Sequence, residues 1–374
     1  MILGVSAEQE ELRASVRRFL ADRAPISRVR ELMDDGETDW AVWEQAGTQL
    51  GLQGLAIPES YGGAGFSFAE QAVVLEEFGA ALYGGPYLAS AVLAATALLA
   101  SPDEGARRGL LPDIASGQTV ATLAFAEDGG SWDPAAIRLS AVKDGPGVDE
   151  AWRLDGHKSF VLDGATAGLI LVVATTDAGL SLFAVEGDAD GLSRAALPAL
   201  DQTRQLARLE FAGVAGRLIG SPSDGAAALD RALDVAAVAL AAEQLGGAQR
   251  ALDMAVQYAK DRRQFDRPIG SFQAIKHRCA DLLLEVESLR SAVGYAAAAV
   301  AEDSAEIPVL ASLVKAYASE TYFHVAAENI QIHGGIGFTW EHDAHLYFKR
   351  AKASELFLGD GAYHRERLAN RIGL

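Results

Sequence analysis

Over residues 1–118, apolar positions recur at the spacing of a helix that has one buried face. Leu12 and Val16 lie one helical turn apart near the start of this block. Ser6 and Gln9 have the spacing of a capping box, in which two side chains bind each other's backbone N–H groups where a helix begins. The pattern predicts a helical N-terminal domain.

In residues 119–223 the pattern changes to short runs of alternating apolar and polar residues, divided by Gly, Asp and Pro. The runs span residues 120–125, 137–142, 152–154, 169–174, 180–185 and 206–211. A period of two indicates strands, and many short strands divided by turn residues are typical of an antiparallel barrel or sandwich. We predict a middle β domain here.

Helical periodicity returns in residues 224–374. The predicted helices span residues 226–260, 271–301, 307–332, 340–352 and 355–370. Blocks in the order α, β, α, without βαβ repeats, exclude a doubly wound parallel sheet. The fold class we predict is α+β with several domains, ending in a helical bundle.

Composition narrows the class of function. Half of the 374 residues are hydrophobic, which is enough for sizeable cores, and the net charge is −19. This charge argues against a nucleic-acid partner, because phosphates are neutralised by a surplus of Lys and Arg. The one cysteine, Cys279, allows no internal disulfide, which suits a reducing compartment and leads us to expect a cytoplasmic protein.

No membrane or secretion signal is apparent in the sequence. The first residues lack a basic stretch followed by an apolar run. The long uncharged stretch after Phe78 is interrupted at residues 84–86, which leaves about fifteen apolar and small residues, fewer than the roughly 18 needed to span a bilayer. We expect a buried helix there and no membrane insertion.

A cluster of arginines lies where two long predicted helices meet, in the run DRRQFDRPIGSFQ at residues 261–273. Arginines at a helix junction can bind a pyrophosphate through charge-assisted hydrogen bonds, and a nearby phenyl ring such as Phe265 can pack on a heterocycle. The same cluster can instead be a solvated basic patch that complements the C-terminus of a helix. The residues alone leave both interpretations open.

Gly334 and Gly335 form a second candidate for phosphate binding, because glycines let backbone N–H groups approach an anion closely. They follow a predicted helix rather than a strand, so they are not a Rossmann fingerprint. A helix C-cap is the alternative interpretation.

Three motifs near the end of the chain closely resemble the C-terminal signature of acyl-CoA dehydrogenases. They are QIHGGIGF at residues 331–338, FKRAK at 348–352 and LFLGD at 356–360. The run at 261–273 resembles the family motif of an acid, an Arg, two variable residues, Phe and a basic-Pro-Ile-Gly turn, and the loop at 58–65 agrees with the family as well. The resemblance covers essentially the whole chain and implies the acyl-CoA dehydrogenase fold, FAD as cofactor and an acyl-CoA substrate.

The resemblance also implies roles for five residues. In such enzymes the residues that correspond to Arg262, Phe265, Gln331, Gly334 and Gly335 contact the ADP half of an FAD that a neighbouring subunit mainly holds. We therefore expect this chain to offer these groups to a partner.

Four positions depart from the family's pattern. Ala126 stands in place of a flavin-binding threonine, Leu162 in place of a hydroxyl residue, and Ala362 in place of a glutamine. Leu358 occupies the usual position of the catalytic glutamate. Because a positioned acid–base group typically contributes ~10²–10⁴ in rate, the loss of this carboxylate bears directly on function. The resemblance implies that all four departures lie in the part of the flavin site that a protomer normally builds for the FAD it holds itself.

Other carboxylates are weak candidates for the base. Some relatives supply it from an earlier helix, at a position that falls near Ala236, and Asp234 two residues away points to another face of a regular helix. Asp360 is the better local candidate, although it lies two residues beyond the usual position. His342 and His345 have no third ligand pattern, so we expect them to be structural rather than a metal site.

These observations lead to one principal hypothesis and three alternatives. The chain resembles the non-catalytic subunits of actinobacterial heterotetramers that desaturate CoA thioesters of sterol side chains, which implies a role in steroid degradation with a second acyl-CoA dehydrogenase-like subunit. Electron-transfer flavoprotein is a possible acceptor. The alternatives are a self-sufficient homotetrameric acyl-CoA dehydrogenase that uses Asp360, a flavin-dependent monooxygenase or oxidase on this fold, and a paralogue that binds no flavin.

Overall fold

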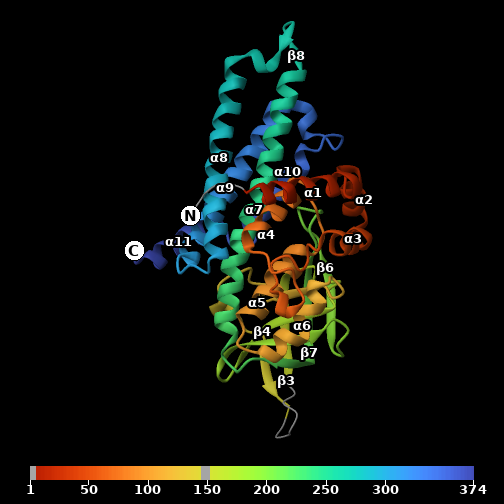
Figure 1. Ribbon diagram of the computed structural model, residues 1–374, viewed down its shortest axis with the longest axis vertical. Helices are drawn as coiled ribbons and strands as arrows, with labels where there is room; N and C mark the ends of the chain where they lie inside the picture. The colour runs from red at the N-terminus through yellow and green to blue at the C-terminus, as the bar shows by residue number, and fades with distance from the viewer. Residues whose placement is uncertain (1–5, 145–151) are drawn as a thin grey trace. The chain divides into compact units, whose positions relative to one another are not determined.

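Helices from both ends of the chain and strands from its middle make up the fold of the computed structural model, which describes residues 6–144 and 152–374 (Figure 1). These residues divide into two units. A helical unit contains residues 6–31, 68–83 and 237–374, and a sheet unit contains residues 32–67, 84–144 and 152–236. Neither unit is continuous in the sequence.

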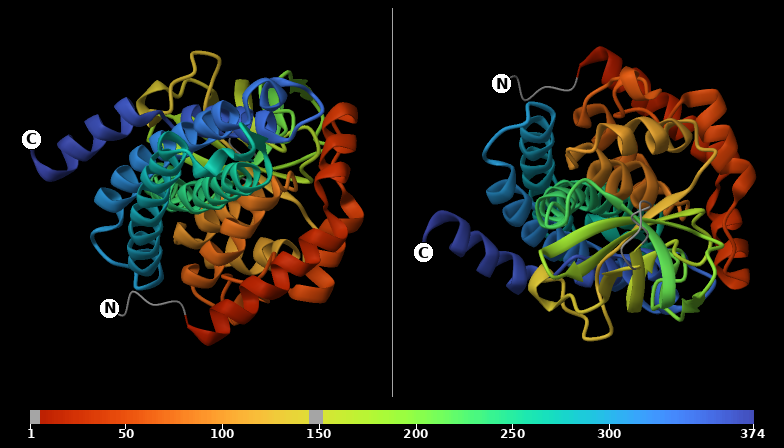
Figure 2. Two further views of the ribbon diagram at one scale, coloured as in Figure 1. Left: turned by 90° about the horizontal axis from the view of Figure 1, so that it is seen from above. Right: turned by 90° about the horizontal axis from the view of Figure 1, so that it is seen from below.

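The helical unit is built from long helices that lie side by side, as the left-hand view of Figure 2 shows along their axes. Its elements are α1 (Ala7–Arg23), α4 (Phe68–Ala81), most of α7 (Gly225–Asp261), the strands β8 (Arg263–Gln264) and β9 (Arg267–Pro268), the short helix η4 (Ile269–Ser271), α8 (Gln273–Ala301), α9 (Ile307–His333), η5 (Gly334–Phe338), α10 (Ala344–Leu356) and α11 (Gly361–Ile372). The predicted capping box is confirmed at α1, where Ser6 Oγ accepts a hydrogen bond from Gln9 N and Gln9 Oε1 accepts one from Ser6 N.

Glycines bring α4 and α7 into close backbone contact. A Cβ atom on Gly79 would lie 1.8 Å from the carbonyl oxygen of Glu243, and one on Gly246 would lie 1.7 Å from that of Glu76. Any larger residue at either position would force the two helices apart. This reciprocal packing explains why α4, which lies early in the chain, belongs to the same unit as α7.

The sheet unit combines the rest of the N-terminal helices with the middle strands, which appear in yellow and green in the right-hand view of Figure 2. Its helical elements are α2 (Ile26–Asp35, for the most part), α3 (Trp40–Leu50), η1 (Glu59–Tyr61), η2 (Leu88–Ala94), α5 (Ala95–Ala100), α6 (Glu104–Ala115), η3 (Pro134–Ala136) and the start of α7. Its strands are β1 (Ala121–Ala124), β2 (Ser140–Lys143), β3 (Trp152–Leu162), β4 (Leu169–Thr176), β5 (Gly179–Glu186), β6 (Leu192–Leu197) and β7 (Leu206–Ile219).

The strands form one seven-stranded sheet in the order β1-β4-β2-β3-β7-β5, with β6 paired to β7. Antiparallel pairs dominate, as the sequence predicts, but β4 pairs in parallel with β1 and, at one position, with β2. The antiparallel expectation is therefore wrong for these pairs. Strand β6 was not among the predicted runs, because LSRAAL at 192–197 exposes most of its side chains and has no clear alternation.

The uncharged stretch after Phe78 is helical and buried, but part of it is wider than an α-helix. Residues of η2 form a π-helix that continues into α5. Every residue of η2 is buried, and the side chain of Ser90 accepts a hydrogen bond from Ala121 N, which attaches η2 to β1. Within the described residues, no helix has the length and hydropathy needed to cross a membrane.

Two helix boundaries near the end of the chain differ from the prediction. Helix α10 begins at Ala344 rather than at residue 340, and α11 begins at Gly361 rather than at 355. A turn at residues 357–360 separates them, because Leu358 and Gly359 both have positive φ values, +62° and +104°. This turn carries Leu358, the position at which the family resemblance predicts a glutamate.

Candidate functional site

Arg262 and Phe265 lie at the end of the helical unit where α7 gives way to the β8–β9 hairpin (Figure 1). Gln264 pairs with Arg267 across the hairpin, and the two residues between them, Phe265 and Asp266, have φ values of +51° and +61°. Positive φ at both loop residues is the geometry of a type I′ turn, which usually takes Asn or Gly. A bulky aromatic residue in this conformation is strained.

The turn presents the Phe265 ring to solvent. Its side chain is 87% exposed, the highest value but one among the large hydrophobic residues described as exposed. Behind it, Phe272 contacts the Phe265 ring edge to face at 6.2 Å and has the guanidinium of Arg267 4.0 Å above its own ring. The hairpin therefore offers an aromatic surface together with arginines.

A ring contact between α7 and α9 brings the second motif to the same end of the unit. Tyr258 and His333 have ring centroids 4.2 Å apart, and Arg262 N donates a hydrogen bond to Tyr258 O at 2.8 Å. Ile332 packs with Ala259 in a small core below the hairpin, against which Ile269 and Cys279 also pack. Arg262 follows Tyr258 by one helical turn and Gly334 follows His333 directly, so the contact between these two rings brings Arg262 and Gly334 to the same end of the unit.

The glycines after α9 form an open loop. Gly334 has φ +64°, and nothing lies within 4 Å of a Cβ built on Gly334 or Gly335. Both glycines and Gln331 are exposed. An exposed loop without side chains is where backbone N–H groups can approach a phosphate.

The turn that carries Leu358 is fixed from beneath by Lys315 of α9. Lys315 Nζ is fully buried and donates to Glu355 O at 3.2 Å, Gly359 O at 3.1 Å and Ser319 Oγ at 2.9 Å. Burial lowers the pKa of Lys315 to about 7, partly offset by the negative charges of Glu355 and Asp360. We call Lys315 and His364 the turn clamp.

His364 supplies the other half of the turn clamp. Its Nε2 lies 3.0 Å from Leu358 O, and because a carbonyl only accepts, Nε2 carries the proton. Burial, followed by the charge of Lys315, lowers the pKa of His364 to about 3, so the ring is neutral near pH 7. Leu358 itself is 4% exposed.

The alternative carboxylates have other surroundings. Asp360 is exposed and is the N-cap of α11, where its side chain accepts a hydrogen bond from Tyr363 N at 2.8 Å. Asp234 and Ala236 are both buried in α7. Ala362 is exposed in the first turn of α11.

The sheet unit holds the other two departures from the family's pattern. Ala126 and Leu162 are buried at 4% and 3% exposure, and neither has a polar side-chain group. The nearby hydroxyl of Ser159 donates to the carboxylate of Asp128, which also accepts from Arg208. Side-chain hydrogen bonds from Arg208 and Ser159 lower the pKa of Asp128 to about 2.

A buried lysine reinforces this part of the sheet unit. Lys158 Nζ donates to Phe125 O and to Glu127 Oε1, both at 2.9 Å. Burial lowers the pKa of Lys158 to about 8. Glu127 also accepts from the backbone N–H groups of Arg138 and Leu139, which holds the loop after β1 closed on itself.

The two histidines near the start of α10 each contact another aromatic ring. His342 lies inside the predicted helix 340–352 but precedes the observed helix, and its Nδ1 accepts a hydrogen bond from Ala344 N at 3.1 Å. Its ring lies 4.2 Å from that of His333, while His345 contacts Trp340. In residues 6–144 and 152–374 no group of three or more His, Cys, Asp or Glu side chains is arranged to hold a metal ion.

Lys315 was missed as a buried charge in the sequence. It interrupts the apolar pattern of α9, and that interruption was the available signal. Glu243 of α7 forms a buried ion pair with Arg350 of α10 at 2.6 Å.

Comparison with known proteins identifies the family. Sequence models of the acyl-CoA dehydrogenase N-terminal, middle and C-terminal domains match residues 6–118, 122–214 and 223–373. The chain is 36% identical over 352 residues to acyl-CoA dehydrogenase IpdE2 of Mycobacterium tuberculosis, which covers 94% of this chain and 93% of that protein.

Solved structures agree with this assignment. A variant of the Tcur3481-Tcur3483 steroid ACAD is 34% identical, with a TM-score of 0.89 over 99% of both chains. The ChsE4-ChsE5 complex from Mycobacterium tuberculosis is 30% identical, with a TM-score of 0.89 over 100% of this chain and 99% of the other. The chain belongs to the acyl-CoA dehydrogenase family of FAD-dependent oxidoreductases.

Proposed function

We propose that this chain is a subunit of an acyl-CoA dehydrogenase that introduces an α,β double bond into an acyl-CoA thioester, and that it completes a flavin site held chiefly by a partner. The observation that carries the proposal is a division between two sets of residues. The groups suited to the ADP half of FAD are exposed, whereas the positions that would serve the flavin ring and the proton transfer hold Ala126, Leu162 and Leu358.

The exposed set fits a dinucleotide by its chemistry. The guanidinium of Arg262 is suited to a pyrophosphate, and the Phe265 ring to the face of a heterocycle. Gly334 and Gly335 leave open space through which backbone N–H groups can reach a phosphate. FAD, when bound, supplies the oxidising power by accepting the β hydrogen with its electrons.

The chain's own residues do not supply an obvious base for the α proton. Leu358 has no group that accepts a proton, and Asp360 caps α11. A partner with a carboxylate at the corresponding position would provide the missing step. We infer from this that the assembly contains a second acyl-CoA dehydrogenase-like subunit, and the similarity to the ChsE4-ChsE5 complex supports the inference.

The relatives also support a class of substrate. One similar structure is described as a steroid ACAD, and we propose a CoA thioester of a steroid-derived acid as the substrate. Electron-transfer flavoprotein is the acceptor we propose, and the single Cys279 fits a cytoplasmic protein.

The test is to purify the chain alone and together with its family partner, and to measure flavin absorbance at equal protein concentration. We expect little FAD and no dehydrogenase activity from the isolated chain, and both from the complex. Arg262→Ala in this chain should lower the FAD content of the complex. The matched control is Arg28→Ala, which removes a partly exposed arginine that pairs with Glu31 and should leave the FAD content unchanged.

Full flavin loading and activity in the isolated chain would overturn the proposal. If that activity were then lost in Asp360→Asn with FAD retained, a self-sufficient enzyme that uses Asp360 would replace it. Oxygen consumption in the presence of a flavin reductase and no other electron acceptor would indicate a monooxygenase or oxidase. A colourless complex would indicate a paralogue that binds no flavin.

A further inference from the structure

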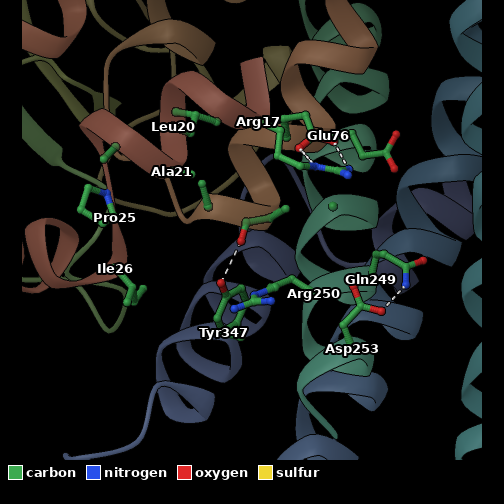
Figure 3. Close-up of a pocket in the computed structure, with 15 residues that line it drawn as sticks. Arg17, Leu20, Ala21, Pro25, Ile26, Glu76, Gln249, Arg250, Asp253 and Tyr347 are labelled. Carbon is green, nitrogen blue, oxygen red and sulfur yellow. Dashed lines mark hydrogen bonds and ion pairs between the residues drawn. The ribbon is translucent and has the colours of Figure 1, made fainter. Parts of the chain in front are cut away.

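A cavity of about 470 Å³ lies within the helical unit, between α1, α4, α7 and α10 (Figure 3). Its volume is in the range of roughly 300–1,000 Å³ that is usual for small-molecule sites. None of the residues assigned above to the flavin or to the base lines it. The cavity is therefore separate from the site proposed above.

One wall of the cavity is apolar. It is formed by the last turn of α1 and the segment that follows, with Leu20, Ala21, Pro25 and Ile26 on one side of the opening in Figure 3. Leu20 is buried, whereas Ala21 and Pro25 are exposed at the mouth. This wall can accept a hydrocarbon body.

Two of the acidic residues that line the cavity are already neutralised by arginines. Glu76 Oε1 lies 2.6 Å from Arg290 Nη1, and Glu76 Oε2 lies 2.9 Å from Arg13 Nη1. Glu77 Oε1 lies 2.8 Å from Arg17 Nη2. These carboxylates present little free negative charge to a ligand.

The two other charged residues that line the cavity, Asp253 and Arg250, form hydrogen bonds with neutral groups. Asp253 accepts a hydrogen bond from the side-chain amide of Gln249 at 2.9 Å. Arg250 is exposed, and its contact in the described part of the chain is with the hydroxyl of Tyr347 rather than with a carboxylate. Tyr347 in turn donates to Ala80 O at 2.8 Å. Arg250 thus provides a cation whose position is fixed by a neutral neighbour.

Tyr347 remains a neutral phenol under ordinary conditions. Burial raises the pKa of Tyr347 to about 12. Its oxygen can therefore accept from Arg250 while its proton is directed to the Ala80 carbonyl. The remaining donors of the guanidinium stay available, since a guanidinium has five N–H groups in a planar fork that matches a carboxylate.

We propose that this cavity is a binding site for an amphiphilic monoanion, in which Arg250 binds a carboxylate and the wall formed by α1 covers an aliphatic or flat apolar body. Glu76 and Glu77 are paired with arginines and Asp253 is hydrogen-bonded to the amide of Gln249, so Arg250 is the cation of the cavity that can bind an added carboxylate. Nothing in this proposal depends on flavin or on the partner subunit.

The probe for the test is decanoate, with decanol as the neutral comparison, titrated into the full-length chain by calorimetry. We expect saturable binding of about one decanoate per chain and at least about tenfold weaker binding of decanol, since charge-assisted hydrogen bonds contribute ~1.5–3 kcal/mol. Arg250→Gln should weaken decanoate binding by at least about tenfold. Ala21→Trp, at the exposed mouth, should weaken it by filling the cavity while Arg250 remains.

Arg23→Gln is the matched control, because Arg23 also lies on α1 but pairs with Asp22 and does not line the cavity. It should bind decanoate as the unaltered chain does. Decanoate binding that does not saturate would overturn the proposal, as would an affinity for decanol equal to that for decanoate. The proposal would also be overturned if Arg250→Gln and Ala21→Trp bound decanoate as tightly as the unaltered chain. Retained binding in Arg262→Ala would confirm that the site is separate from the flavin half-site.

Discussion

Among single residues, Lys315 is unusual because its amino group is buried and contacts no carboxylate of the described residues. An ammonium group has three N–H donors, and Lys315 has three acceptors within hydrogen-bond distance, two carbonyls and one hydroxyl. Hydrogen bonding is therefore complete even though burial disfavours the charge. The apolar pattern of α9 predicts its buried face, but sequence alone does not disclose what a lysine on that face would bind.

Lys315 should make stability depend on pH. Its pKa falls from 10.5 to about 7 on folding, so between these values the unfolded chain binds a proton that the native chain does not. The free energy of unfolding then rises with pH in this window. Lys158, with a pKa of about 8, adds to the rise only above that pH.

We expect Lys315→Met to lose the rise in stability between pH 7 and 8. The measurement is the urea midpoint at several pH values, with Lys276→Met, which removes an exposed lysine, as the control. A slope equal to that of the unaltered chain would contradict the assignment of the shifted pKa to Lys315.

Phe265 gives a second prediction at the residue scale. A left-handed conformation costs roughly 1–2 kcal/mol in most residues, and Asn tolerates it better. Phe265→Asn should therefore raise the free energy of unfolding by about 1 kcal/mol and lower the FAD content of the complex. Urea unfolding and flavin absorbance measure the two effects. Asp266→Asn is the control, and a loss of stability in Phe265→Asn would refute the claim of strain.

At the scale of elements, a buried hydrogen bond to one side chain links the π-helix η2 to β1. Ser90 Oγ accepts from Ala121 N at 3.0 Å in a buried setting. Ser90→Ala would leave that N–H without a partner, which costs ~1–3 kcal/mol. Thermal unfolding should show the loss, while Ser291→Ala on the exposed face of α8 should change little. Equal stability of both variants would contradict this role.

Sequence patterns predicted the long helices well, but they predicted the bounds of short helices and the pairing of strands less well. Helices α7, α8 and α9 lie within two residues of the predicted bounds, because their apolar period is sustained over many turns. The break between α10 and α11 was predicted at residues 353–354 but lies at residues 357–360, where Gly359 and Asp360 carry the C-cap and N-cap preferences that mark one. The parallel pairing of β1 with β4 depends on contacts between distant segments, which no local pattern encodes.

At the scale of the whole molecule, the net charge of −19 implies self-repulsion in the folded state. Salt screens such repulsion, since the Debye length falls from about 30 Å at 0.01 M to about 8 Å at 0.15 M. We expect the Tm to rise by on the order of 2 °C between 0.01 and 0.15 M NaCl. Differential scanning calorimetry at constant pH measures it, with sucrose in place of salt as the control. A Tm that falls with salt would indicate that ion pairs such as Arg17–Glu77 outweigh repulsion.

The arrangement of the chain into units was beyond the reach of the sequence. Blocks of periodicity suggest three consecutive segments, whereas α1 and α4 pack with the C-terminal helices. The cause lies in residues whose roles are visible only in three dimensions, such as Gly79 and Gly246 at a helix contact. The candidate site could be predicted only through the family resemblance. Taken singly, the arginine cluster could be a solvated basic patch and the glycine pair could be a helix C-cap.

The turn clamp has a consequence for how a two-subunit enzyme can arise. Lys315 and His364 hold the turn by the backbone carbonyls of Gly359 and Leu358, so these two hydrogen bonds do not require a particular side chain at residue 358. Chains with different residues at position 358 can then share the same hydrogen-bonded turn, provided that each side chain tolerates the positive φ and the burial found there. In the assembly proposed above, a partner subunit can use the same turn to present a base that this chain does not supply.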